Sequence, residues 1–142
     1  MIEILERFGR FKRAMNLLMV KDIKPLGLGP KQASMLRYLS NNPESSHADL
    51  ARHTVTDPAA TGRVVAGMIA RGLVRQMEHP SDKRRWVLSL TPRGRTLARR
   101  ITVHVDEMAK HIAAPLNSKE RKILIELLDR IEDSLTQKGY LQ

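Results

Sequence analysis

The chain has 142 residues, 42% of them hydrophobic, and this length suits one globular domain with a single core. It contains no cysteine, which excludes disulfides, thiolate metal sites and cysteine nucleophiles and is compatible with a reducing cytoplasm. Its formal net charge of +10 favours a polyanionic partner, although a basic surface would also suit RNA, an anionic membrane or simple solubility.

An amphipathic helix is predicted at the N-terminus, ending before Pro25. Apolar residues recur there at steps of three and four and form one stripe: Ile4, Phe8, Phe11, Met15 and Leu18. Charges interrupt this segment every few positions, so it lacks the apolar core of a signal peptide and the span of a membrane helix. We therefore expect a cytoplasmic protein without a membrane partner, and the stripe needs a surface that covers it.

Two short helices are predicted after the Pro/Gly-rich connector 24–30. The first covers 31–39. Ser46 stands three residues before Asp49, as in a capping box, and begins a second helix that ends near His53.

A helix of about four turns is predicted next. Asp57 supplies an N-cap acceptor and Pro58 is pre-set for the first helical position, while Gly72 suits the left-handed residue that ends a helix. Residues at spacings of three and four form its inner face: Thr61, Val64, Val65 and Met68. With the preceding short helix it makes a helix-turn-helix.

The segment from His79 to Gly94, HPSDKRRWVLSLTPRG, is the most informative part of the chain. It predicts a basic turn between two short strands, roughly 74–78 and 85–90. Asp82 lies two residues before Arg84, and we expect its carboxylate to hold the Arg84 guanidinium in one pose. Arginine is drawn to the negative potential of a narrow minor groove. A hairpin that follows a helix-turn-helix predicts a winged helix-turn-helix, mainly α with a small β-hairpin wing.

Two more helices complete the predicted fold. Thr91 caps a helix that Pro92 opens and that runs to about Ala113. Ser118 caps the last helix, which carries apolar residues on one face: Ile123, Leu124, Leu127, Leu128, Ile131 and Leu135.

The run ARGLVRQMEHPSDKRRWVLSLTPRG, from Ala70 to Gly94, resembles the consensus of the MarR family of bacterial and archaeal transcriptional regulators. The shared features are a helix-ending Gly-Leu-Val, a strand, a D-x-R wing and L-T-x-x-G, and the resemblance covers most of the chain. It implies a homodimer that binds double-stranded DNA at a pseudo-palindromic operator as a repressor and leaves it when a small aromatic or lipophilic effector binds.

The resemblance also implies how the chain is organised. One MarR-like domain spans 1–142, with dimerisation helices at 1–24 and 115–142, a DNA-binding region at 30–92 and a connecting helix at 93–114. The residues expected to pair two copies are Ile4, Phe8, Phe11, Met15, Leu124, Leu128, Ile131 and Leu135. An effector pocket is expected between the dimer helices and the DNA-binding region.

The DNA contacts are assigned to two segments. The recognition helix offers Pro58, Ala59, Ala60, Gly62 and Arg63, and the wing offers Asp82, Lys83, Arg84 and Arg85. Only Arg63 among the helix residues can make a bidentate contact, to guanine or phosphate, while the alanines suit thymine methyl groups. The family pattern has a hydroxyl residue, an acidic residue and a long polar residue where this chain has Gly62, Ala66 and Gly67. We therefore expect much of the specificity for an operator to come from DNA shape.

Other functions are less well supported by the sequence. His104 and His111 are seven residues apart, but zinc needs three or four convergent ligands, so we expect no metal and no cofactor. No Gly-rich phosphate loop or Ser/His/acid arrangement indicates an enzyme. The remaining alternative is a non-specific architectural or RNA-binding winged helix, which would lack the roughly thousand-fold operator preference of a regulator.

Overall fold

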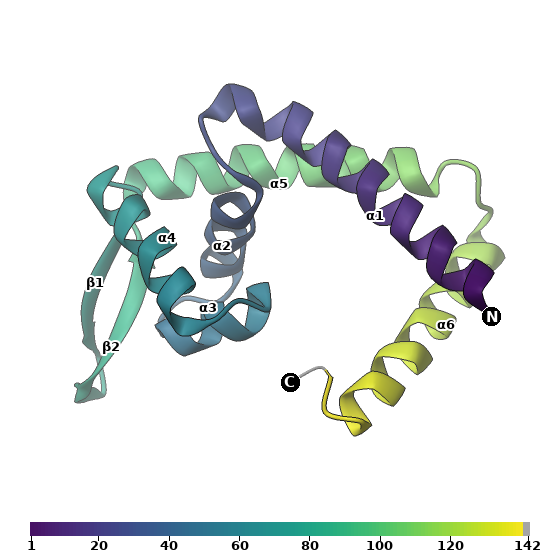
Figure 1. The fold of residues 1–142 in the computed structure, drawn as a ribbon. Helices are drawn as coiled ribbons and strands as arrows, with labels where there is room; N and C mark the ends of the chain where they lie inside the picture. The colour runs from purple at the N-terminus through teal and green to yellow at the C-terminus, as the bar shows by residue number, and fades with distance from the viewer. Residues whose placement is uncertain (141–142) are drawn as a thin grey trace. The chain divides into compact units, whose positions relative to one another are not determined.

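The computed structural model describes residues 1–140, which fold into helices and one two-stranded antiparallel hairpin (Figure 1). In chain order the elements are α1 (Ile2–Ile23), η1 (Lys24–Leu26), α2 (Pro30–Asn41), α3 (His47–Thr54), α4 (Pro58–Ala70), β1 (Val74–His79), β2 (Asp82–Leu90), α5 (Pro92–Ala113) and α6 (Ser118–Gln137). The predicted mainly α fold with a β-hairpin wing is confirmed. The chain forms two compact units that divide between Val105 and Asp106, within α5, and each unit is described by itself.

The first unit begins with α1, which ends before Pro25 as predicted. The one-turn 3-10 helix η1 follows, and Gly27 closes it with a left-handed φ of +69° while its N–H donates to the carbonyl oxygen of Lys24 at 2.9 Å. Helix α2 begins at Pro30 and runs two residues beyond the predicted end. The Gln32 side chain accepts a hydrogen bond from the Gly29 N–H at 3.1 Å and stabilises this start.

The predicted caps of the helix-turn-helix are confirmed. Ser46 Oγ accepts from the Asp49 N–H at 3.2 Å, and Asp49 Oδ2 accepts from the Ser46 N–H at 2.7 Å, which completes a reciprocal capping box on α3. Val55 then takes a left-handed φ of +49° and turns the chain toward α4. Gly72 has a φ of +67° after α4, as predicted for a glycine that ends a helix.

The core of this unit lies where α2, α3, α4, the hairpin and the first half of α5 meet. Its most buried side chains include Ile23, Met35, Leu36, Leu50, Val65, Met68, Leu73, Val74, Leu88, Ala98 and Ile101. Burying one large aliphatic side chain contributes roughly 1.5–3 kcal/mol, so this cluster fixes α4 against the hairpin. In Figure 1 the hairpin extends beside α4, with which β1 is in contact.

The hairpin joins α5 through a very close backbone approach. Thr91 Oγ1 donates to the carbonyl oxygen of Gly72 at 2.6 Å and accepts from the Gly94 N–H at 3.0 Å, which confirms Thr91 as the cap of α5. A Cβ built on Gly94 would lie 1.9 Å from the carbonyl oxygen of Leu73. Glycine is therefore required at Gly94 because the two backbones leave no room for a side chain.

The second unit contains α6. Its predicted N-cap, Ser118, is wrong, because Asn117 caps the helix. Asn117 Oδ1 accepts from the N–H groups of Lys119 and Glu120 at 2.9 and 3.0 Å, and Glu120 Oε2 accepts from the Asn117 N–H at 2.8 Å. Asn and Ser cap helices about equally well. The helix starts at Asn117 because Glu120, three positions ahead, completes a capping box with it.

Candidate nucleic-acid interface

The start of α4 is fixed by its cap. Asp57 Oδ1 accepts from the Ala60 N–H at 2.8 Å, and Pro58 occupies the first helical position. This hydrogen bond, together with the charge of Arg63, lowers the pKa of Asp57 below its ordinary value, so the carboxylate stays ionised. The first turn of α4 is therefore fixed by a side-chain cap and by a proline whose φ suits the helix.

The two faces of α4 divide as the sequence predicts. Thr61, Val65 and Met68 are buried, and Val64 is half-buried. Pro58, Ala59, Arg63 and Ala66 are exposed, whereas Ala60, Gly62 and Gly67 are partly exposed. Arg63 is the exposed basic residue within α4, and the exposed residues nearest to it along the helix, Ala59 and Ala66, are small.

Lys83 and Arg84 were predicted in the turn of the wing, but they lie in β2, as Arg85 does. Only Pro80 and Ser81 form the turn, because His79 pairs with Asp82. The next pair joins Glu78 to Trp86, so the three intervening residues, Lys83 to Arg85, bulge from the ladder. Their side chains are all exposed.

The expected ion pair between Asp82 and the Arg84 guanidinium is also wrong. Asp82 Oδ1 instead accepts from the backbone N–H of Arg84 at 3.1 Å, and no ion pair between the two side chains occurs among the described residues. A short carboxylate bonds readily to an amide two residues ahead, which is an Asx turn. Asp82 therefore fixes the backbone of the bulge and leaves the Arg84 guanidinium free.

The base of the wing is anchored to the segment before α3. The Leu88 N–H donates to the carbonyl oxygen of Ser45 at 2.8 Å, and Val87, Leu88 and Leu90 are buried. The exposed bulge is therefore carried by a fixed base, in the same unit as α4.

Two helices carry exposed apolar stripes. On α1, Phe8 and Phe11 are 41% and 49% exposed, Ile4 is exposed and Met15 is half-buried. On α6, in the second unit, Leu124, Ile131 and Leu135 are exposed and Leu128 is half-buried. Such contiguous apolar surface on a helix marks a contact with another molecule or another part of the chain.

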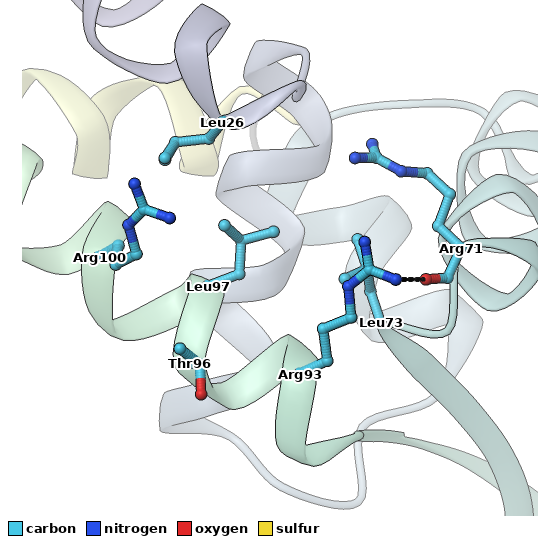
Figure 2. A pocket seen from close by; sticks show the side chains of 7 residues that line it. All are labelled: Leu26, Arg71, Leu73, Arg93, Thr96, Leu97 and Arg100. Atoms are coloured by element: carbon cyan, nitrogen blue, oxygen red, sulfur yellow. Dashed lines mark hydrogen bonds between the residues drawn. The ribbon is translucent and has the colours of Figure 1, made fainter.

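Sequence reasoning missed a pocket in the first unit, where Arg71, Arg93 and Arg100 surround Leu97 (Figure 2). Its lining comes from the chain after α1, the end of α4 and the start of α5. The signal available in the sequence was the arginine-rich run from Arg93 to Arg100.

The described residues offer no metal site and no membrane span. His104 and His111 belong to no group of three or more potential His, Asp or Glu ligands within residues 1–140. In the same part of the chain, every helix is too short or too polar to cross a bilayer.

Comparison with known proteins shows which family the chain resembles in sequence. The model of the MarR family matches residues 26–85. The chain is 34% identical over 112 residues to a putative transcriptional regulatory protein for the hcr operon of Thauera aromatica, covering 78% of this chain and 68% of the relative. It is 31% identical over 109 residues to the HTH-type transcriptional repressor Rv2887 of Mycobacterium tuberculosis, covering 77% and 78%. Both relatives are named as transcriptional regulators.

Solved structures share the fold. The PcaV transcriptional regulator of Streptomyces coelicolor, solved in complex with its natural ligand, is 26% identical with a TM-score of 0.71 and coverage of 88% of each chain. The Staphylococcus aureus MepR–DNA complex is 19% identical with a TM-score of 0.83, and the match covers 92% of this chain and 96% of MepR. The second likeness concerns the fold alone.

Proposed function

Because this chain belongs to the MarR family of DNA-binding transcriptional regulators, we propose that it is a repressor that binds a pseudo-palindromic operator as a homodimer. One observation carries the proposal: a single unit presents both the exposed outer face of α4 and the exposed basic bulge Lys83–Arg85. A helix for the major groove and an arginine-bearing hairpin for the minor groove are the two probes of a winged helix-turn-helix. Selection of tight sites from a random duplex pool tests it, and a preference below about a thousand-fold over random DNA would indicate an architectural protein instead.

We assign base reading in the major groove to Arg63. The neighbouring Pro58, Ala59, Ala60 and Gly62 allow the helix to approach the bases closely but offer no side-chain donors. Replacing Arg63 with Ala should therefore relax the base preference at one position of each half-site, at a cost of about 1–3 kcal/mol. If the selection returned the same preferences at every position, direct reading by Arg63 would be refuted.

We assign the minor-groove contact to Arg84 and phosphate contacts to Lys83 and Arg85. The Asp82 bond to the Arg84 amide sets the bulge, so Asp82 acts as a positioning residue. Arg84→Ala should weaken operator binding without changing the fold, because the side chain is exposed. Lys83→Ala or Arg85→Ala should reduce the slope of log K against log salt by about one unit each. Lys119→Ala, an exposed charge on α6, is the matched control and should change neither measurement.

We assign dimerisation to the segments 1–24 and 115–142. The support is that each carries an exposed apolar stripe, on α1 and on α6. If these stripes pair two copies, Ile131→Asp should dissociate the dimer and expose the remaining stripe to water. Sedimentation of the wild-type chain decides the matter, because a stably folded monomer at micromolar concentration would contradict the assignment.

We propose that a small aromatic or lipophilic effector releases the operator. The support is that PcaV, 26% identical, was solved with its natural ligand. A ligand of this kind would act by binding more tightly to a form of the dimer that is unsuited to DNA.

A further inference from the structure

We propose that Trp86 is a contact to the DNA backbone, and that its indole packs against a deoxyribose ring at the wall of the minor groove when Arg84 occupies that groove. The inference rests on the proposed function. Trp86 is the only tryptophan of the chain, and it is 53% exposed. Tryptophan is highly buried on average and is enriched where one molecule contacts another.

The strand pairing determines the face of the hairpin on which Trp86 lies. Trp86, Leu88 and Leu90 alternate along β2 and therefore share one face. Leu88 and Leu90 belong to the buried core, whereas the residues from Asp82 to Trp86 are all exposed. In Figure 1 the turn of the hairpin projects beyond the helices. The indole thus continues the core-facing side of β2 into open surface, next to the bulge Lys83–Arg85.

The surroundings of the indole do not suit a protein partner. On the same face of the hairpin its neighbours on β1 are polar, because Glu78 pairs with Trp86 and Gln76 pairs with Leu88. The other exposed large apolar side chain of the hairpin, Met77, lies on the opposite face. A protein contact is marked by a contiguous apolar patch, and a single indole among polar and basic residues does not form one.

The spacing from Arg84 places the indole over the wall of the groove. Two residues of extended chain span at most about 7 Å, and the minor groove of B-DNA is about 6 Å wide. When the Arg84 guanidinium is inside the groove, Trp86 lies over one of the two backbones that bound it. Lys83, Arg84 and Arg85 form no ion pair with any carboxylate of residues 1–140, so their charges can meet the phosphates of that backbone.

The cross-strand partner of Trp86 selects the sugar over the phosphate. Glu78 is exposed beside the indole, and its carboxylate repels a phosphate at that point. The deoxyribose ring is uncharged and carries apolar C–H groups, so it is the part of the backbone that fits an indole there. Such a contact adds affinity that depends neither on base sequence nor on counterion release, unlike the contacts assigned to Arg84 and Lys83.

The fluorescence of the wild-type chain reports this contact directly, because Trp86 is its only tryptophan. The probe is a mixed-sequence duplex of about 24 base pairs, long enough for two half-sites one helical turn apart. Anisotropy of a fluorescein-labelled copy at low salt shows when the chain is bound. With the unlabelled duplex at saturation, acrylamide should quench the indole about half as efficiently as in the free chain or less. A single strand of the same sequence should protect the indole less than the duplex does.

Variants give a second, independent measurement. Trp86→Ala should weaken binding of the mixed-sequence duplex and of a selected operator about ten-fold each, the loss expected when a buried aromatic contact is truncated. The ratio of the two affinities and the slope of log K against log salt should stay as in the wild type, since no base contact and no charge is lost. Trp86→Phe should keep most of the affinity. Met77→Ala is the matched control on the opposite face and should bind as the wild type does.

The outcomes separate this contact from the proposed function. A bound duplex that leaves the indole as open to acrylamide as in the free chain would overturn the contact and leave the regulator standing. The contact is equally refuted if Trp86→Ala changes the salt slope or the base preferences, or if Met77→Ala weakens binding as much. Equal protection by the single strand would assign the indole to base stacking instead. Failure of both duplexes to bind would refute the regulator and the contact together.

Discussion

Replacing Gly94 with Ala is expected to destabilise the first unit strongly. The added Cβ would lie 1.9 Å from the carbonyl oxygen and 2.9 Å from the carbonyl carbon of Leu73. An ordinary contact needs at least about 3.4 Å, so the start of α5 and the start of β1 must separate by roughly 1.5 Å. Both atoms belong to backbone and cannot rotate away as the end of a side chain could.

The magnitude follows from what this separation disturbs. Leu73 and Val74 are buried on one side and Ala98 on the other, so the shift disrupts a packed core. Overpacking of this kind costs up to about 3 kcal/mol, and the higher helix propensity of Ala returns at most about 1 kcal/mol. A forced backbone shift of this size stands at the upper end of that cost, about 3 kcal/mol, so we expect Gly94→Ala to lower the free energy of unfolding by about 2 kcal/mol.

Urea unfolding followed by far-ultraviolet circular dichroism, at one fixed protein concentration, measures this loss. Gly67→Ala is the matched control. A Cβ on Gly67 meets nothing within 4 Å, so Ala should stabilise α4 by about 0.5–1 kcal/mol. The reasoning is refuted if Gly94→Ala changes the unfolding free energy no more than a typical surface substitution, about 0.5 kcal/mol.

Three further predictions concern stability. Within the described chain Thr61 Oγ1 is buried without a hydrogen-bond partner, so Thr61→Val should raise the free energy of unfolding by about 1 kcal/mol, and a decrease would show that the hydroxyl is satisfied. Hydrogen bonds from Ser46 lower the pKa of Asp49 below 3.8. The ionised carboxylate therefore adds to the free energy of unfolding above pH 3.8, and this contribution is lost as the pH falls through the pKa of the folded state. The difference in unfolding free energy between wild type and Asp49→Asn should shrink over that pH range. Desolvation and, after it, the charge of Arg37 lower the pKa of His53 below 6.5. The folded state therefore favours the neutral ring, and the free energy of unfolding declines as the pH falls below 6.5. Urea midpoints measured over this pH range should decline less for His53→Gln than for the wild type.

The order and type of the helices could be predicted because their signals are local. Ser46 with Asp49 and Asp57 with Pro58 mark helix starts through bonds that span three residues. The division of α4 into a buried and an exposed face follows from spacing alone, since a helix repeats every 3.6 residues. The same locality explains the one-residue error at α6, where Asn117 and Ser118 are both competent caps.

The details of the wing needed the structure. The bulge at Lys83–Arg85 depends on which residues of β1 and β2 pair, and the register comes from packing across the hairpin and not from the order of residues. The sequence also could not say whether Asp82 bonds to the side chain or to the amide of Arg84, because both are within its reach.

The sequence by itself determined the helix-turn-helix, the presence of a basic wing and the resemblance to a family, because caps, periodicity and turn residues act over a few positions. Only the tertiary structure decided the approach of Gly94 to Leu73 and the pocket that brings Leu26, Arg71 and Arg100 together. These residues lie far apart along the chain, and their meeting depends on how a shared core packs the elements that carry them.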